Sequence, residues 1–256
     1  MRTRAATAAL LLALTSAGCS SSGDANDQGE PGEPGAEQRL TVLAAASLTE
    51  TFTELARELE AEQPGVDVTL AFDSSATLAQ QALEGAPADL LATADTRTID
   101  SAADALAAAP EVFATNTLVL VVPAGNPAGI ESVDDLAGAT YVACVETAPC
   151  GASWAALADQ QGIDTEPASL EVDVKAVLAR VVADEVDAGI VYASDAVAAG
   201  DAVETLDLPG SEEQVTSYAL GLLEQSSEPA LAQDFADLVL GETGRGVLTD
   251  AGFGVP

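Results

Sequence analysis

Histidine is absent from this chain of 256 residues, and lysine occurs once, at Lys175. Without imidazole, the Ser-His-Asp and Cys-His forms of nucleophilic catalysis are excluded, as are zinc sites that need histidine. The candidate site residues identified below also include no lysine or paired carboxylates that could move protons. We therefore predict that the protein is not an enzyme.

Basic charge is scarce, with eight Lys and Arg residues against 42 Asp and Glu residues and a formal net charge of −34. Loss of residues 1–18 would remove two of the basic residues and none of the acidic ones, leaving about −36. Such a chain repels the phosphates of nucleic acid, so we expect no nucleic-acid partner. We interpret the acidic residues as groups that keep the protein surface solvated.

Long apolar runs are confined to the first residues, MRTRAATAALLLALTSAGCS. Arg2 and Arg4 precede an apolar run from Ala5 to about Ala17, which is too short to span a bilayer and is followed by small residues. This pattern predicts a secretory signal peptide over residues 1–18. Residues 19–38 contain no large apolar side chain and are rich in Ser, Gly, Pro and acids, so they predict a flexible tether.

Cysteine is rare, with three in the chain. Cys144 and Cys150 lie six residues apart in a chain that is predicted to be exported. In that setting a disulfide is favoured over a metal site or a pair of reactive thiols.

Strand and helix signals alternate from residue 40 onward, which predicts an α/β fold with buried, mostly parallel sheets. Apolar spacing predicts a helix over about 48–61, a strand over 66–72 and a helix over about 76–84. A helix is expected through residues 99–108 and a strand over 116–127. Further helices are expected in VDDLAG, GASWAALADQQG, VKAVLARVVADE, SEPALAQDFADLVLGE and GRGVLTDAG, with strands in LTVLAAA, ADLLATAD, TYVACV, AGIVYAS and SYALGLLEQ.

Ser47 stands where a run of small residues meets the first predicted helix, in LAAASLTETFTELARELE. Ser47 and Glu50 have the spacing of a capping box, in which the hydroxyl and the carboxylate accept hydrogen bonds from free backbone N–H groups. A serine at a helix start can also offer its hydroxyl to a bound anion. The two roles need not exclude each other.

Four stretches, in order and at familiar spacing, together resemble the molybdate-binding proteins that feed ABC importers. They are AAASLTETF, FDSSATLAQQALEGAPADLLATAD, GIVYASDA and ETGRGVLTDAGFGVP, and the similarity runs from about Leu40 to Pro256. Cys19 also resembles the acylated cysteine of bacterial lipoproteins, although Ser16 stands where that motif prefers leucine.

The resemblance implies a two-lobed periplasmic-binding-protein fold of type II, with the ligand cleft between the lobes. Residues 40–116 and 217–256 would form lobe 1, and residues 117–216 would form lobe 2.

The resemblance also implies a ligand set in which every member is a neutral donor. Four of the residues fall at or beside predicted helix starts, where free N–H groups and the helix dipole favour anions. Asp73 departs from the small neutral residue that the family has there, and we expect it to point away from the anion. The implied ligand-binding residues are Ser47, Ser75, Cys150, Val174 and Tyr192.

Each of these positions also has a purely structural interpretation. Ser75 could be only a helix cap, Cys150 only a disulfide partner, and Val174 and Tyr192 only core residues. We expect Trp154 to pack its helix on the sheet, and Asp89 and Asp95 to hold loops together. No arginine or lysine is expected to contact the ligand.

The expected function is capture of molybdate, and of tungstate, by a lipoprotein that serves an ABC importer. The alternatives are a binding protein for sulfate or another tetrahedral oxyanion, and a sensor or interaction lipoprotein of the same fold that serves no transporter. The expected partners are the oxyanion, the importer permease and a membrane reached through the lipid on Cys19 alone. We expect a monomer without a cofactor, exported to the outer face of the cytoplasmic membrane.

Overall fold

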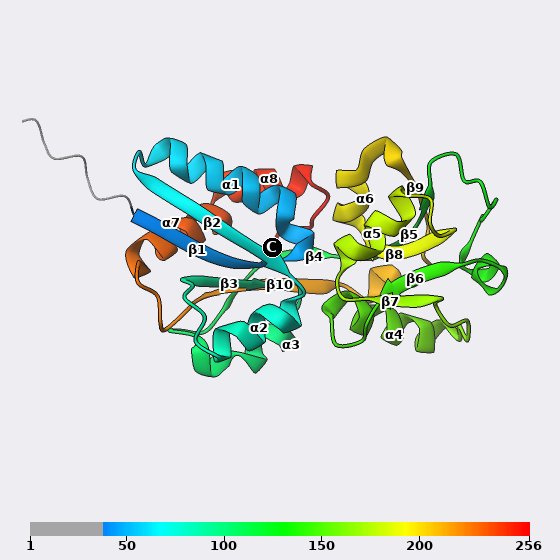
Figure 1. Cartoon of the computed structure of the whole chain (residues 1–256), viewed down its shortest axis with the longest axis horizontal. Coiled ribbons are helices and arrows are strands. Elements are labelled where there is room, and N and C mark those ends of the chain that lie inside the picture. Colours follow the sequence, from blue (N-terminus) through cyan, green and yellow to red (C-terminus); the bar gives the residue numbers. More distant parts are fainter. Residues whose placement is uncertain (1–37) are drawn as a thin grey trace, which may run out of the picture. The chain divides into compact units, whose positions relative to one another are not determined.

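A computed structural model describes residues 38–256, which contain two five-stranded sheets with helices on both faces (Figure 1). The first sheet has the strand order β2-β1-β3-β10-β4. Its strands are β1 (Gln38–Ala45), β2 (Val66–Asp73), β3 (Leu90–Thr93), β4 (Glu111–Asn116) and β10 (Thr216–Leu222). The second sheet has the order β7-β6-β8-β5-β9. Its strands are β5 (Leu118–Pro123), β6 (Tyr141–Cys144), β7 (Ser169–Glu171), β8 (Ala188–Tyr192) and β9 (Val203–Leu206).

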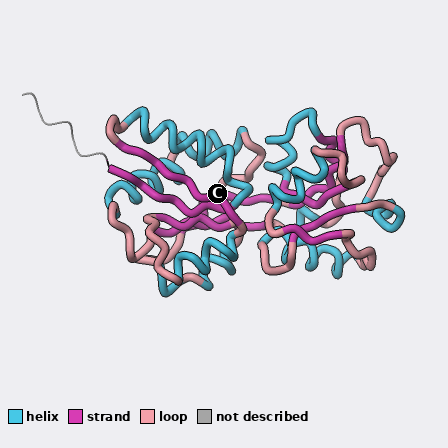
Figure 2. Tube along the Cα trace, viewed as in Figure 1, coloured by secondary structure: helices cyan, strands magenta, loops and turns pink. Residues whose placement is uncertain are grey.

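Helices cover both faces of each sheet, as Figure 2 shows. Helices α1 (Thr49–Glu62), α7 (Pro229–Leu240) and α8 (Glu242–Asp250) pack together on one face of the first sheet, and α2 (Ser75–Leu83) and α3 (Thr96–Ser101) lie on the other. In the second sheet, α5 (Val174–Val182) and α6 (Ala193–Ala199) lie opposite α4 (Pro149–Gln161). Short 3₁₀ turns span Ala46–Leu48, Ala103–Ala105, Val133–Gly138, Gly200–Ala202 and Ser211–Glu213.

Burial explains why the central strands are almost wholly apolar. In β1, residues from Leu40 to Ala45 are buried on both faces apart from Thr41, whereas the edge strand β2 alternates between half-buried and exposed positions at its start. Strands covered on both faces carry continuous apolar runs, and an edge strand with one solvated face alternates. The α/β prediction is confirmed.

The expectation of mostly parallel sheets is wrong, because half of the strand pairings are antiparallel. Strand β10 is antiparallel to β3 and β4, and β5 is antiparallel to β8 and β9. These are the two strands that follow a passage of the chain from one sheet to the other. A strand that enters without a crossover helix is free to run against its neighbours, whereas the strand-helix-strand units stay parallel.

Several other expectations need correction. The helix expected through residues 99–108 ends at Ser101, because Leu106 forms a bridge with Leu223 and thus leaves the helix for the sheet. The strand expected over 116–127 begins at Leu118 and ends at Pro123. Four short elements had no prediction, namely β4, β7, α6 and β9.

The predicted signal peptide, the lipidated Cys19 and most of the tether lie outside the described residues. Within residues 38–256, no helix has the length and apolarity needed to cross a membrane.

Candidate ligand-binding site

A small pocket lies where strands from both sheets end. Ala45 and Asp73 close β1 and β2, Ala94 follows β3, and Tyr192 closes β8. Ligands of open α/β sheets bind outside the carboxyl ends of the strands. The pocket has a cavity volume of about 20 Å³, which suits a small ion, whereas larger organic ligands fill pockets of roughly 300–1,000 Å³. Its lining comprises Ala45, Ala46, Ser47, Asp73, Ser74, Ser75, Ala94, Ala148, Pro149, Cys150, Asp173, Val174 and Tyr192.

Three α-helices of at least nine residues begin in this lining, namely α2, α4 and α5. The 3₁₀ turn Ala46–Leu48, which leads into α1, also contributes. The first N–H groups of a helix have no partner within it and carry partial positive charge. Several helix starts at one pocket therefore favour an anion there.

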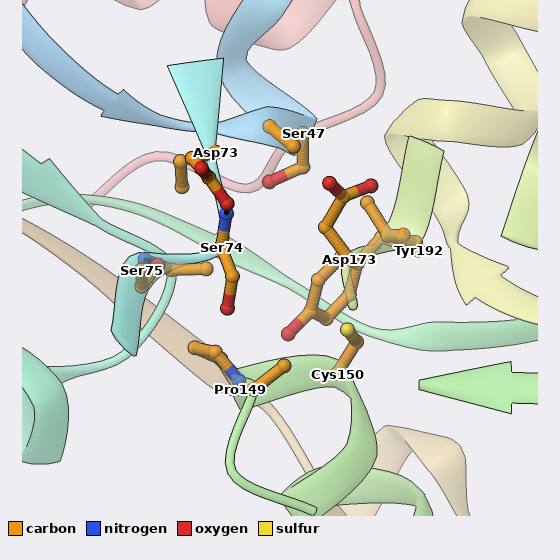
Figure 3. A pocket seen from close by; sticks show the side chains of 13 residues that line it. Ser47, Asp73, Ser74, Ser75, Pro149, Cys150, Asp173 and Tyr192 are labelled. Carbon is orange, nitrogen blue, oxygen red and sulfur yellow. Dashed lines mark hydrogen bonds between the residues drawn. The ribbon is translucent and has the colours of Figure 1, made fainter. Parts of the chain in front are cut away.

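All five residues that the sequence predicted for the ligand set line this one pocket. They come from five different segments: Ser47 from the 3₁₀ turn, Ser75 from α2, Cys150 from α4, Val174 from α5 and Tyr192 from β8. Figure 3 shows the labelled members from both sheets gathered around the same space.

Ser47 does not form the predicted capping box. Helix α1 begins at Thr49 with Leu48 at its N-cap and no side-chain cap, because the 3₁₀ turn moves Ser47 away from the cap position. The buried Ser47 hydroxyl instead lies 2.9 Å from the hydroxyl of Tyr218.

Ser75 is the first residue of α2 and is buried. Its Oγ accepts a hydrogen bond of 3.0 Å from the N–H of Ala94, which fixes the side chain between α2 and the end of β3. Because the Oγ of Ser75 is the acceptor in this bond, the hydroxyl proton of Ser75 is still available for donation to a ligand. The structure assigns Ser75 no side-chain cap, so its interpretation as a helix cap is wrong.

Cys150 lies in the first turn of α4 and is joined to Cys144 at the end of β6 by a disulfide, with a Cα–Cα distance of 5.8 Å. The predicted pairing is thus present in the structure. A Cβ at Gly151 would collide with the backbone carbonyl of Val145, so only glycine fits beside the bridge. Cys150 itself lies in the pocket lining.

Val174 opens α5, and the preceding Asp173 is its N-cap. The Asp173 carboxylate accepts a hydrogen bond of 2.8 Å from the N–H of Ala176. The Asp173 carboxylate thus satisfies the N–H of Ala176, and the N–H groups of the two preceding residues do not bond to it. Val174 lies in the pocket lining at a helix start, where the first N–H groups have no partner within the helix.

Tyr192 is 1% exposed, and its hydroxyl has no hydrogen-bond partner among residues 38–256. Figure 3 shows this hydroxyl pointing into the space beside Ser74 and Cys150. Burial raises the pKa of Tyr192 well above its usual range. A buried phenol without a partner is costly, and a ligand oxygen in the pocket would satisfy it.

The pocket lining contains two carboxylates and no basic side chain. Asp73, which we expected to point away, lies in the lining, where its Oδ1 accepts a hydrogen bond of 2.6 Å from the N–H of Ser74. Lys175 follows Val174 but pairs with Glu50, at 2.7 Å, and with Asp195, at 3.1 Å. The groups that can donate to an anion in this lining are therefore N–H groups and hydroxyls.

Sequence reasoning missed seven residues of the lining, namely Ala45, Ala46, Ser74, Ala94, Ala148, Pro149 and Asp173. Pro149 and Asp173 carried a local signal, since proline at the first helical position and aspartate at the N-cap are typical of helix starts. Ser74 precedes Ser75 in the same motif, and Figure 3 shows its side chain pointing into the same space as the Tyr192 hydroxyl.

The residues expected to be structural are confirmed in that role. Trp154 is buried and stacks edge-on against Tyr141 at 6.1 Å. Asp89 accepts hydrogen bonds from the N–H groups of Thr41 and Ser227, and Asp95 caps α3. No cluster of metal-ligating side chains occurs in the part of the chain that the structure describes.

Comparison with known proteins assigns the fold and site to one class. Residues 40–254 match the family model of the bacterial extracellular solute-binding proteins. The chain belongs to this family, and its two sheets form the two-lobed fold of periplasmic binding proteins.

The resemblance to molybdate-binding proteins is also confirmed. The chain is 42% identical over 221 residues to the molybdate-binding protein of Mycobacterium tuberculosis, covering 85% of each chain. It is 26% identical over 255 residues to a putative ABC transporter substrate-binding lipoprotein of Bacillus subtilis, covering 96% of this chain and 95% of that protein.

Two solved structures show the same fold. The periplasmic molybdate-binding protein of Azotobacter vinelandii superposes with a TM-score of 0.76 at 20% identity, covering 85% of this chain and 99% of that one. A sulfate-binding protein of Mycobacterium tuberculosis superposes with a TM-score of 0.73 at 21% identity, covering 84% and 86%.

Proposed function

We propose that this protein captures molybdate, and also tungstate, and delivers it to the permease of an ABC importer. The observation that carries the proposal is the meeting of three helix starts and the unpartnered hydroxyl of Tyr192 at one small pocket. The proposed contacts are the hydroxyls of Ser47, Ser75 and Tyr192 and the backbone N–H groups of Cys150 and Val174.

The donors in the pocket favour an anion that carries no proton. Molybdate, tungstate and sulfate are fully deprotonated at neutral pH and accept hydrogen bonds only. Hydrogen phosphate brings a proton that needs an acceptor. The carboxylates that could accept it, Asp73 and Asp173, each already accept one backbone N–H and repel the dianion. An unpaired proton in a buried site costs roughly 1–3 kcal/mol.

We assign molybdate rather than sulfate as the ligand because the relative with the higher sequence identity is a molybdate-binding protein. The Mycobacterium tuberculosis protein that is 42% identical carries the name of a molybdate-binding protein. The sulfate-binding neighbour, at 21% identity, supports the fold alone. Sulfate is also smaller than molybdate, so donors fixed on two lobes would not all reach it.

The proposed setting is the outer face of the cytoplasmic membrane, with the lipid on Cys19 as the anchor and residues 19–38 as the tether. The naming of the Bacillus subtilis relative as a lipoprotein supports this anchor. We propose a monomer that carries its ligand without a resident cofactor and catalyses no reaction.

Isothermal titration with molybdate, tungstate, sulfate and phosphate tests the proposal directly. We expect tight binding of molybdate and tungstate, weaker binding of sulfate and poor binding of phosphate. Absence of binding by all four would favour the sensor or interaction alternative, and tighter binding of sulfate than of molybdate would favour the sulfate alternative.

Two alanine variants test the proposed contacts. Ser47→Ala and Ser75→Ala should each weaken molybdate binding by roughly 1.5–3 kcal/mol, the worth of a hydrogen bond to a charged group. Ser101→Ala is a matched control, because the Ser101 hydroxyl donates to Thr98 within α3 and lies outside the pocket lining. Losses of only a few tenths of a kcal/mol would assign the two serines a structural role alone.

A further inference from the structure

A chain of buried hydrogen bonds runs behind the pocket and ends at Ser47. The Nδ2 of Asn116 lies 3.4 Å from the hydroxyl of Tyr218, and that hydroxyl lies 2.9 Å from the Oγ of Ser47. All three residues are at most 4% exposed. Asn116 and Tyr218 are absent from the pocket lining, so they would act on a ligand only through Ser47.

The orientation of the Asn116 amide is determined by its neighbour. The backbone N–H of Thr117 donates to Oδ1 of Asn116 at 3.0 Å. A backbone N–H can only donate, so the atom facing it must be the oxygen. The NH₂ group then faces Tyr218 and the Oγ of Ser194, which lies 2.8 Å away.

The direction of the remaining bonds follows by elimination. The NH₂ group of Asn116 cannot accept, so the single proton of the Tyr218 hydroxyl has one acceptor in residues 38–256, the Oγ of Ser47. Were Ser47 to donate to Tyr218 instead, the phenol proton would be buried without a partner, at a cost that folded proteins avoid. Tyr218 therefore donates and Ser47 accepts.

The ring of Tyr218 is held in place on several sides. It makes edge-on contacts with Phe113, Tyr192 and Phe253, at centroid distances of 6.2, 5.9 and 5.3 Å. Rings packed in this way leave the phenol little freedom to turn from Ser47. The geometry is thus fixed before any ligand arrives.

We infer that Asn116 and Tyr218 are positioning residues that set Ser47 as a hydrogen-bond donor toward the pocket. Because the Oγ of Ser47 accepts from Tyr218, its proton is directed to the ligand, which must present an oxygen that accepts it. The chain of bonds thus favours an acceptor oxygen of the ligand at this position. The inference rests on the proposed function.

A double-mutant cycle tests the inference with molybdate as the probe. Tyr218→Phe removes the donor and keeps the ring, and we expect it to weaken molybdate binding roughly 3- to 10-fold, on the scale of one hydrogen bond. In a Ser47→Ala background the same change should have almost no effect, because the residue through which Tyr218 acts is gone. An equal loss in both backgrounds, or no loss in either, would overturn the inference.

A second variant reverses the chain of bonds. In Asn116→Asp, an acceptor replaces the NH₂ group, so Tyr218 would donate to residue 116 and accept from Ser47. The Ser47 proton would then point away from the ligand, and molybdate affinity should fall as far as in Ser47→Ala, roughly 10- to 150-fold. Asn126→Asp adds the same charge outside the pocket lining and should leave the affinity within about twofold.

The two proposals fail in different ways. If the unmodified protein binds none of the four oxyanions, the proposed function fails. If it binds molybdate but Asn116→Asp keeps the unmodified affinity, the positioning role fails and the proposed function stands. Circular dichroism of each variant checks that it is folded before titration.

Discussion

Lys175 joins helix α5 to helix α1 by donating to both carboxylate oxygens of Glu50, at 2.9 and 2.7 Å. Its ammonium also lies 3.1 Å from Oδ1 of Asp195, a carboxylate that is fully buried. The one lysine of the chain thus links a helix of the first sheet to two helices of the second. Its charge is engaged outside the pocket.

The two partners of Lys175 should differ in what they contribute to stability. Glu50 is 52% exposed, so Glu50→Gln should cost at most about 1 kcal/mol of the free energy of unfolding. Lys175→Met removes the cation that pairs with the buried Asp195 carboxylate and should cost roughly 3–5 kcal/mol. Urea unfolding measures both. Adding Asp195→Asn to Lys175→Met should recover much of the loss, and equal costs for the two single variants would contradict this assignment.

Asp195 should make stability depend on pH in an unusual direction. Burial raises its pKa to about 6, with Lys175 opposing and the Glu50 carboxylate adding to the rise. A carboxyl whose folded pKa exceeds its unfolded value of about 3.9 holds its proton more tightly when folded. Its contribution to stability is therefore greatest near pH 4 and is lost as the pH rises through about 6.

The matched variant Asp195→Asn isolates this effect from the other carboxylates. Relative to that variant, the unmodified protein should lose roughly 2–3 kcal/mol of unfolding free energy between about pH 4 and pH 7. Unfolding curves of both proteins at several pH values provide the measurement. A difference that stays constant over this range would show that Asp195 has an ordinary pKa in the folded state.

Asp73 should weaken molybdate binding and favour protonated oxyanions. A carboxylate beside a dianion opposes it, and replacement by a neutral amide should gain roughly 1 kcal/mol for molybdate. The same carboxylate can accept the proton of hydrogen phosphate, because it has lone pairs beyond the one that the N–H of Ser74 uses. Asp73→Asn should therefore tighten molybdate and loosen phosphate, which competitive titration would detect. A gain for both anions would mean that Asp73 acts through charge alone.

The disulfide should stabilise the start of α4. Cys144 and Cys150 are six residues apart, and closing so short a loop is worth about 2 kcal/mol in the chain-entropy description. The double variant Cys144→Ala/Cys150→Ala should lose about that much, and reductant should bring the unmodified protein to the same value. Reductant added to the double variant is the control, and it should change nothing.

Apolar spacing predicted the first helices and strands well, because this signal depends only on residues that are close in the sequence. The apolar spacing of Phe52, Leu55 and Leu59 predicted α1 to within one residue of its observed start, and period-two alternation predicted β2. The five site residues were predicted from the resemblance to molybdate-binding proteins, and all of them line one pocket.

Local sequence patterns could not predict contacts between residues that are far apart in the sequence. The partner of Ser47 is Tyr218, 171 residues away, and nothing near Ser47 indicates it. The helix expected through residue 108 ends early because Leu106 pairs with the distant Leu223. Strand β7 has three residues, Ser169–Glu171, too few to show a period.

The burial of Tyr192 has a consequence for where such a protein can work. A solute-binding protein outside the cytoplasm meets whatever acidity its surroundings impose, and its affinity is useful only if it survives those changes. Ser47 and Ser75 do not titrate, and Tyr192 keeps its proton into strongly alkaline solution because burial raises its pKa. A pocket without histidine or lysine in its lining thus holds its donors constant while the medium varies.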